Sequence, residues 1–597
     1  MAEEKETVTR HNDVPAEHGL HHSITANTDT IIGFEADLGD LPKGYYRSKL
    51  FLGSMFATGM GLWAAVSTFG MVAPVIGYIN ADIGPSASYV WISIIYNVVL
   101  AVSLAPIGRL SDIFGRRYFF IGGGVIAVIG CIVCATAKTI PVLIGGNVLL
   151  GISTATQLCF HFVMGELVPM KYRYTGGAIL YLFGIPGSGF GPAMATSFIT
   201  KYPSVGWRAI YWLLLAGNVV ALICWILFYF PPSFHKKHRN DIDSKMYWVK
   251  NFDYIGLALF TCGFVAFLLG LSWGGATYPW KSAAVIVSIV GGFAVLVVFV
   301  LYEIYAPQKE PLLPVHLFRN GHWVASCVLL GLGAGVYYAF AIIWPMQVAV
   351  LYGDGRILWV GLASCINGLS TISGQFVGGM LANKIGKTRF QCSAMFLIGG
   401  TFLGCAAVSN PYNFKTAIAL IFMGCFFIGW NETICLANST IVVHDQRYIG
   451  IAGGLAGSMR SGITSVIIAI YVSILTNKLT SNVASMVPAA LTSAGLPATS
   501  VTGFITALGV GTPAAFDMVP GINSTILAAG SIAYKEANAG AYRTVYLSTI
   551  AFSVLGLALT FFAPNTEKHM TGKVAATLGN EDDTVLEKKQ VDHLEEE

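Results

Sequence analysis

Runs of about twenty apolar residues recur along this chain of 597 residues, and short polar stretches separate them. A bilayer core takes about 20 apolar residues per helix, and we find fourteen such runs. Only 11% of the residues are charged, against about 25% in a soluble domain. The sequence therefore excludes a soluble globular enzyme. It predicts an all-α polytopic membrane protein with fourteen transmembrane helices, near residues 50–73, 89–108, 118–137, 140–164, 175–199, 209–230, 253–273, 282–303, 323–350, 358–382, 391–408, 416–442, 450–475 and 544–563.

The basic residues indicate how these helices are oriented. If the N-terminus is cytosolic, the short cytosolic loops hold sixteen Lys and Arg residues and the short outer loops hold six. Basic residues concentrate in cytosolic loops, so we expect both polar tails, residues 1–49 and 564–597, in the cytosol. The acidic end of the second tail, residues 585–597, is expected to be a solvated or weakly helical segment. The net charge of +4 is small, and no basic stripe suits a phosphate backbone. We expect no nucleic-acid partner.

One expected outer loop, residues 476–543, is much longer than the others. It is rich in Ser, Thr, Ala, Gly and Pro and contains a glycosylation sequon at Asn523. Its stretch 501–510 is mildly apolar, and we expect a short helix lying on the outer face. A fifteenth span is the alternative, and it would place the C-terminal tail outside. The sequons at Asn431 and Asn438 lie within a span, and we expect them to be unused.

Two short patterns occur twice, and both recur at nearly the same offset. G-x-L-x-D/N-x-x-G-R/K occurs at 108–116 and again at 379–387, and Arg-Tyr-x-Gly occurs at 173–176 and again at 447–450. Such matches indicate a six-helix unit used twice in parallel, an architecture of transporters that bind substrate between their halves. We expect one six-helix bundle at 50–230, a cytosolic loop and two inserted helices at 231–322, and a second bundle at 323–563.

These patterns resemble the signatures of a known superfamily. The segment 108–117 resembles the loop signature of the major facilitator superfamily, and 187–192 resembles its antiporter signature. Fourteen spans are typical of its drug:proton antiporter branch. The segments 165–174, 185–193, 271–282 and 301–320 resemble the fungal trichothecene efflux pump family, to which fungal siderophore transporters are close. The resemblance implies a major facilitator fold in a monomer of the plasma membrane, with a vacuolar or endosomal membrane as the alternative.

The loop after the second span is expected to be a conformational gate. Gly108 and Gly115 permit close helix approach and a tight turn. Asp112 can accept hydrogen bonds from Arg116, from Arg117 or from a helix N-terminus across the bundle. We expect this contact to break when the two halves rock.

The fifth span carries the antiporter-like motif. Gly187 and Gly191 are four positions apart and share one helix face, while Pro186 and Pro192 remove backbone donors and bend the helix. The resemblance, rather than the geometry, implies antiport. It would also place a proton-coupling arginine in the fourth span, where this chain has Asn147. That arginine's role is therefore not carried over.

Two charges lie deep within the predicted spans, Glu432 in the twelfth and Arg460 in the thirteenth. Glu432 precedes the loop centred near residue 446 by as many positions as Arg460 follows it, so the two lie at the same depth and can form an ion pair. A buried charge is costly in a membrane and usually functional. Three interpretations stay open: a static pair, a proton site at Glu432 whose charge Arg460 senses, or contact of Glu432 with a cationic or metal-bearing substrate.

Eight further side chains are candidates for a substrate cavity. They combine aromatic surface with neutral polar groups, which suits an oxygen-rich hydrophobic ligand. These candidates are Trp63, Tyr96, Asn97, Gln157, Tyr337, Tyr338, Asn367 and Gln375. Near the end of the fourth span we expect Glu166 to order the following loop and His161 to have a minor role in the pathway.

The sequence favours one function over several alternatives. We expect proton-coupled export of hydrophobic small molecules, such as a trichothecene-like toxin or a drug. The alternative is uptake of a ferric siderophore by proton symport, and a non-transporting nutrient sensor is a third hypothesis. We find no Walker motif, no Ser/His/Asp set and no metal-ligand array, so we expect no enzyme activity, no cofactor and no bound metal.

Overall fold

The apolar runs form long helices in the computed structural model. It describes residues 31–578 apart from 32–33, 35, 40, 42, 87, 90, 232–244, 276–277, 307–310 and 511–512. Much of the predicted cytosolic loop after residue 230, and most of both predicted tails, therefore lie outside the described residues.

Thirteen helices in the described part of the chain are long and apolar enough to cross a membrane. In the first half these are α1 (Lys49–Val72), α3 (Trp91–Phe114), α4 (Arg116–Ala135), α5 with α6 (Ile140–Gln157, Phe160–Leu167) and α9 (Arg208–Phe228). The inserted pair is α12 (Tyr254–Trp273) and α13 (Ala283–Tyr305). The second half has α15 (Gly321–Gln347), α16 (Ile357–Ile385), α17 (Thr388–Cys405), α18 (Phe414–Ile441), α19 (Ile449–Ser493) and α22 (Ser524–Thr560).

The fifth predicted span is the fourteenth crossing, and it is not one continuous helix. It consists of α7 (Arg173–Tyr181), a π-helix at Ile185–Gly189 and α8 (Gly191–Lys201). Pro186 and Pro192 lack the N–H groups that a regular helix needs, which is the physical reason for the interruption. Expecting a single bent helix over 175–199 was therefore wrong.

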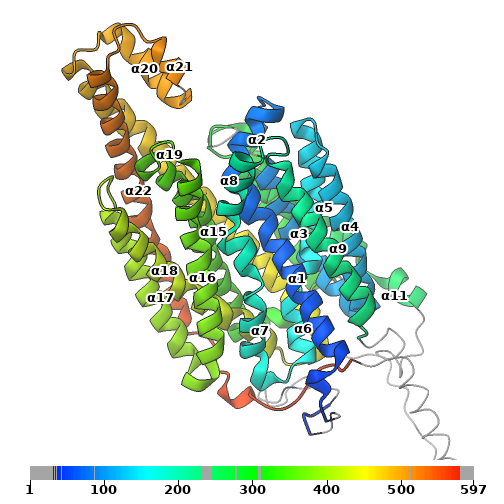
Figure 1. Cartoon of the computed structure of the whole chain (residues 1–597). Helices are drawn as coiled ribbons and strands as arrows, with labels where there is room; N and C mark the ends of the chain where they lie inside the picture. Colours follow the sequence, from blue (N-terminus) through cyan, green and yellow to red (C-terminus); the bar gives the residue numbers. More distant parts are fainter. Residues whose placement is uncertain are drawn as a thin grey trace, which may run out of the picture.

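An even number of crossings brings both described ends of the chain to the same side of the bundle. Ala36 and Val574 pair there as an isolated antiparallel bridge. The repeated segments 108–117 and 379–389, each with the loop that follows its helix, reach this side as well, and we call it the motif end. Figure 1 shows it at the bottom, with α2 (Ile76–Ile83) and α8 at the opposite end.

The two halves meet mainly along two pairs of elements, α3 with α19 and the fifth span with α16. α3 of the first half packs along α19 of the second, and α16 packs along both α7 and α8. The inserted helices α12 and α13 pack on each other, and α12 also contacts α3 and α19. The outer surface of α13 exposes Val287, Val290 and Phe293, as expected of a helix in lipid. The insertion therefore packs against the α3 and α19 side of the two bundles, and none of its described residues lines the cavity between the halves.

The predicted long loop 476–543 is mostly helical, whereas one short helix was expected in it, at 501–510; that helix is present as part of α20 (Ala498–Val510). α19 has 45 residues and α22 has 37, so both continue well beyond the ~30 Å apolar core. α20 and α21 (Pro513–Asp517) join their ends (Figure 1). Alanine-rich sequence favours helix here. With 13 residues α20 is too short to span a bilayer, which rules out the fifteenth-span alternative in this structure.

Candidate transport site

A cavity lies between the two halves at mid-height of the bundle. α1, α3, α6 and the fifth span line it from the first half, and α15, α16, α18 and α19 line it from the second. Its volume is about 90 Å³, enough for several water molecules. Ligand pockets for drug-sized molecules are usually about 300–1,000 Å³. A ligand of that size requires the halves to move apart.

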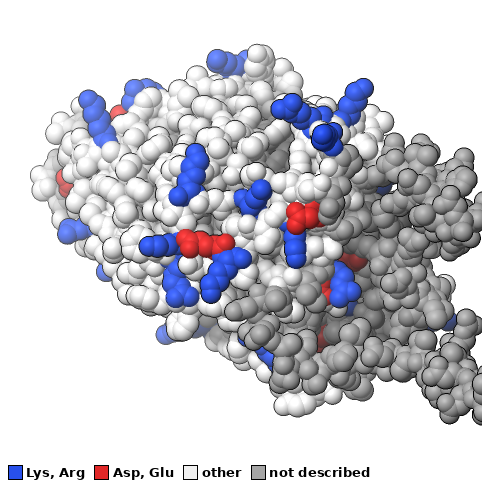
Figure 2. Space-filling model, turned by 90° about the horizontal axis from the view of Figure 1, so that it is seen from below, with Lys and Arg blue, Asp and Glu red and all other residues white. Residues whose placement is uncertain are grey.

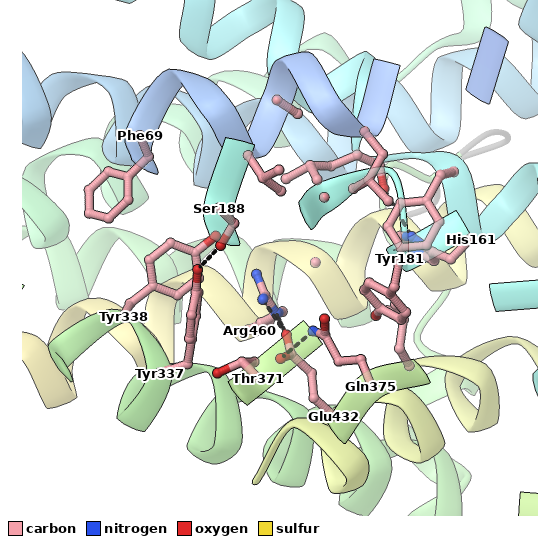
Figure 3. Close-up of a pocket in the computed structure, with 18 of the residues that line it drawn as sticks. Phe69, His161, Tyr181, Ser188, Tyr337, Tyr338, Thr371, Gln375, Glu432 and Arg460 are labelled. Carbon is pink, nitrogen blue, oxygen red and sulfur yellow. Dashed lines mark hydrogen bonds and ion pairs between the residues drawn. The ribbon is translucent and has the colours of Figure 1, made fainter. Parts of the chain in front are cut away.

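The deep ion pair lies on the wall of this cavity (Figure 3). Both Nε and Nη2 of Arg460 donate to Oε1 of Glu432, the first at 3.1 Å. Nε2 of Gln375 donates to Oε2 of the same carboxylate at 3.0 Å. The guanidinium of Arg460 also lies over the ring of Tyr338, 5.4 Å from its centre. The carboxylate is thus paired with a cation and hydrogen-bonded on both oxygens.

Exposure differs between the two partners of this pair. The side chain of Glu432 is 2% exposed and that of Arg460 is 18% exposed. The guanidinium therefore presents part of its surface to the cavity, while the carboxylate is covered by its two donors. A ligand that is to reach the carboxylate must displace Gln375 or Arg460.

Four of the eight predicted cavity side chains line the cavity: Tyr96, Tyr337, Tyr338 and Gln375. The hydroxyl of Tyr96 donates to the carbonyl of Ala65 at 2.8 Å, so it is engaged within the first half. Tyr337 shares a 2.5 Å hydrogen bond with Ser188 of the π-helix, which joins the two halves beside the ion pair. His161 also lines the cavity, and its ring nitrogens face the carbonyls of Leu158 and Gly453.

The other four predicted cavity residues pack elsewhere. Trp63 lies against α9, where a methyl group on Gly217 would come 1.8 Å from its ring. Gln157 donates to Asn218 at 2.6 Å within the first half. Asn97 donates to the carbonyl of Ser93 on its own helix, and Asn367 accepts from Cys425. In these helices polar side chains also face neighbouring helices away from the cavity. Residue type alone therefore did not identify the face that lines the cavity.

Several lining residues were not singled out from the sequence. They are Phe69, Tyr181, Ser188 and Thr371. Thr371 lies one turn before Gln375 on α16, and Tyr181, Gly184 and Ser188 follow one face of the fifth span. The i, i+4 spacing from Gln375 is a signal that could have identified Thr371.

The predicted gate loop joins the two halves at the motif end. Asp112 accepts from Nη2 of Arg116 at 3.0 Å and from the backbone N–H of Ile451, in the first turn of α19, at 2.7 Å. A carboxylate is favoured at a helix N-terminus. A methyl group on Gly108 would lie 2.5 Å from the carbonyl of Gly450, so α3 and α19 are in direct backbone contact here.

Arg116 and Arg117 have different surroundings. Arg116 is buried and pairs with Glu166 at 2.6 Å as well as with Asp112. Arg117 turns away from the gate, donates to the carbonyl of Ile226 and lies over the ring of Phe230. Gly115, with φ of +89°, makes the one-residue turn between α3 and α4.

Further hydrogen bonds across the halves close the motif end. Arg173 donates to the carbonyl of Thr440 at 3.2 Å and to Gln446 at 2.9 Å. Tyr174 donates to Asn438, and Asn383 donates to the carbonyl of Lys171. Asn383 occupies the position in the second repeat that Asp112 occupies in the first. In each half, the side chain at this position therefore forms a hydrogen bond with the other half. The cavity is therefore sealed from the motif end by contacts that rocking must break.

Glycines of the antiporter-like motif let the π-helix pack tightly. A methyl group on Gly187 would lie 1.8 Å from Oγ of Ser67, and one on Gly191 would lie 3.0 Å from the carbonyl of Gly70. From the other half, a methyl group on Gly368 would lie 1.9 Å from the carbonyl of Ser188. The fifth span is thus held between α1 and α16. Asn147 lies away from the cavity and donates to Leu143 on its own helix.

Known proteins resemble this chain over nearly its whole length. Solved structures give the fold: the proton:xylose symporter XylE matches with a TM-score of 0.53 at 14% identity, covering 89% of this chain and 99% of its own. The human organic anion transporter MFSD10 matches with a TM-score of 0.50 at 12% identity, covering 85% of this chain and 99% of its own. Both are major facilitator proteins, which confirms the predicted fold.

Sequence relatives are transporters of fungi. The trichothecene efflux pump TRI12 of Fusarium sporotrichioides is 28% identical, covering 90% of this chain and 89% of its own. TRI12 of Trichoderma arundinaceum is 29% identical and covers 90% of each chain. The MFS-type transporter prx5 of Penicillium rubens is 28% identical, covering 88% of this chain and 93% of its own. The model of the fungal trichothecene efflux pump family matches residues 28–592. This chain, an efflux transporter of the major facilitator superfamily, therefore belongs to the fungal trichothecene efflux pump family.

Proposed function

We propose that this transporter exports hydrophobic, oxygen-bearing small molecules, trichothecene-like toxins or drugs among them, and admits protons in exchange. The observation that carries the proposal is the carboxylate of Glu432 on the wall of the cavity between the halves, paired with Arg460 and Gln375. Two relatives are named as trichothecene efflux pumps. Both halves that enclose the cavity are parts of the same polypeptide, which supports our proposal of a monomer as the functional unit.

Exchange requires that proton and substrate exclude each other. A substrate hydroxyl that donates to Glu432 gains most when the carboxylate is ionised, because a charged acceptor forms the stronger hydrogen bond. Protonation of Glu432 replaces the charged acceptor with a weaker neutral one and also releases Arg460 from its ion pair. Substrate binding and proton binding then compete at one side chain, which is what antiport needs.

The same geometry indicates how a symporter would differ. A ligand whose oxygen accepts from Arg460 binds better after Glu432 is protonated, because the guanidinium is then free of its partner. Proton and ligand would bind together, as uptake of a ferric siderophore by symport requires. The class of polar group that the substrate presents to this pair therefore sets the direction of coupling.

We propose that the motif end faces the cytosol and that the transporter lies in the plasma membrane. Figure 2 looks onto the motif end, and Lys and Arg side chains predominate over Asp and Glu on it. The repeated loops at this end contain Arg117, Lys384 and Lys387, and Lys171 lies beside them. Positive charge next to the spans is typical of the cytosolic side. The state described here is then closed toward the cytosol.

The proposal is tested with Glu432→Gln in proteoliposomes loaded with a labelled trichothecene. We expect the variant to lose gradient-driven transport and to keep exchange of labelled for unlabelled substrate, because the cavity remains and the proton site does not. Glu536→Gln, an exposed glutamate of α22, is the matched control and should behave as the parent. Gradient-driven transport at the parent rate in Glu432→Gln would refute the proton site. Proton-driven accumulation of a ferric siderophore by the parent would refute export.

A further inference from the structure

The segment after the last span crosses the motif end as an ordered strap. We define the C-terminal strap as Pro564–Leu578. It leaves α22 in the second half, runs beneath α17 and α7 and reaches the first half beside α1 and α6 (Figure 1, red). The sequence predicts a polar cytosolic tail from residue 564, and it did not indicate that the first part of this tail packs on the bundle. The solvated or weakly helical segment expected at 585–597 lies outside the described residues.

The strap begins with hydrogen bonds to its own half. The backbone N–H of Lys387, in the repeated loop between α16 and α17, donates to Oε1 of Glu567 at 2.5 Å. Oγ1 of Thr388 donates to the carbonyl of Pro564 at 3.0 Å. Thr566 is buried and its hydroxyl is 2.8 Å from that of Tyr174, which belongs to the first half. The crossing between halves starts at this residue.

The far end of the strap is bound to the first half. Lys171 and Met170 donate their backbone N–H groups to the carbonyls of Thr571 (3.1 Å) and Lys573 (3.3 Å). The N–H of Ala576 donates to the carbonyl of Glu166 at 3.0 Å. Main-chain hydrogen bonds therefore attach the strap both to Glu166 and to Met170 and Lys171, the two ends of the 166–171 region.

Apolar side chains anchor the same stretch. Val574, Ala576 and Leu578 are buried, whereas Thr571 and Lys573 are exposed, so the strap has the two-residue alternation of an extended chain with one covered face. Leu578 packs in the apolar cluster formed by α1, α6 and α9, and its N–H donates to the hydroxyl of Tyr45 at 2.8 Å.

The strap ends at the gate. Glu166, whose carbonyl accepts from Ala576, pairs through its carboxylate with Arg116, and Arg116 pairs with Asp112 at the N-terminus of α19. The strap is covalently part of the second half, yet its distal residues are bound to the region that contacts this gate. Rocking that separates the halves at the motif end pulls the two attachments apart.

We propose that the C-terminal strap is a latch that holds the motif end closed and must release the 166–171 region before that end opens. The latch acts on the conformational equilibrium and not on the cavity. The proposed latch does not depend on which substrate or ion the transporter carries, so opening of the motif end can also be measured without a transport assay.

The first experiment locks the latch with a disulfide. Lys171→Cys and Thr571→Cys are introduced together in a background where the exposed Cys262 and Cys405 are Ser. We expect the oxidised double variant to lose at least nine-tenths of its transport, about the ten-fold effect of 1.4 kcal/mol, and to regain it on reduction. The single Thr571→Cys variant under the same oxidant is the control. Parent-level transport by the fully cross-linked protein would overturn the proposal.

The second experiment weakens the latch and needs no transport assay. Ala576→Pro removes the N–H that donates to Glu166, whereas Ala575→Pro places the same residue where the N–H donates no hydrogen bond among the described residues. Thr440→Cys, buried beside Arg173 at the motif end, reports opening through its rate of reaction with a maleimide in detergent. We expect about a five-fold faster reaction in Ala576→Pro, the change that one net hydrogen bond makes to an equilibrium, and the parent rate in Ala575→Pro. Equal rates in the two proline variants would overturn the proposal.

Discussion

Glu432 and Arg460 each occupy a position that would penalise a lone charge. A single charged side chain at the centre of a membrane helix costs about 2.5–3.5 kcal/mol on insertion scales. Here each charge has its partner on the adjacent helix, and Gln375 covers the second carboxylate oxygen. The arrangement neutralises the pair while leaving the guanidinium partly exposed to the cavity. A proton or a ligand can therefore shift the balance at this one point.

Removing one partner should cost much more than removing both. Arg460→Gln leaves an uncompensated buried carboxylate, and we expect it to destabilise the protein by about 3–5 kcal/mol. The double variant Glu432→Gln with Arg460→Gln leaves neutral amides, and we expect most of that loss to be recovered. Thermal unfolding in detergent measures both. If the double variant is as unstable as the sum of its single variants, the two charges are not coupled.

The sequence indicated this pair because both residues are charged. The equal number of residues that separates each from the loop near residue 446 also placed them at the same depth in the membrane. The sequence did not indicate that Gln375 holds the carboxylate, since a neutral amide has no such signature in a membrane helix. The same limit explains why Trp63, Gln157 and Asn367 were expected at the cavity and lie elsewhere. Depth follows from counting residues, whereas the rotation of a helix about its axis depends on its neighbours.

At the scale of single elements, the fifth span is packed closely on two sides. Its π-helix packs against Ser67 of α1 on one side and against Gly368 of α16 on the other. In the first contact the backbone of Gly187 lies next to the short side chain of Ser67, and in the second the backbone of Gly368 lies next to the backbone of Ser188. The prolines interrupt the helix, and the glycines provide the space for the interruption.

Gly187→Ala tests how closely this element is held. Its new methyl group would come 1.8 Å from Oγ of Ser67, so we expect a loss of about 1–3 kcal/mol from overpacking. The matched control is Gly177→Ala on α7, where a methyl group meets nothing within 4 Å. Melting temperatures in detergent should fall for the first variant and not for the second. A fall of equal size in both would mean that loss of glycine flexibility, and not the contact with Ser67, is responsible.

Local composition is a poor guide to structure at two other elements. Residues 476–493 and 524–543 look like a loop because they are rich in small and polar residues, yet they continue α19 and α22 as helices. The strap looks like a solvated tail because its charges are more obvious than the alternation of Val574, Ala576 and Leu578. In both cases the deciding contacts come from distant parts of the chain, which local composition does not contain.

For the whole molecule, the repeat of six helices determines how the two halves contact each other. Asp112 of the first half binds the start of α19, and Asn383 at the equivalent position of the second half binds the loop before α7. These reciprocal contacts lie at the motif end, while the cavity lies between them and the opposite end. The two repeated patterns, with their shared offset, predicted the pairing of the halves. The patterns could not predict which end is closed, because the state closed at the motif end and the state closed at the opposite end have the same sequence.

The orientation of the whole molecule is tested by glycosylation at Asn523. This residue is exposed at the start of α22, and its Oδ1 caps the helix by accepting from the N–H of Ile526 at 2.8 Å. If the end opposite the motif end faces away from the cytosol, Asn523 carries a glycan, and an endoglycosidase should increase the protein's electrophoretic mobility.

Two variants of the sequon serve as controls. Thr525→Ala destroys the sequon and keeps the cap, and Asn523→Asp removes the amide and keeps a capping oxygen. Both should migrate as the deglycosylated parent without loss of stability. Asn431 and Asn438 are buried in α18, so no glycan should remain on either variant. Enzyme-sensitive mobility that persists in both variants would place the glycan elsewhere and remove this support for a cytosolic motif end.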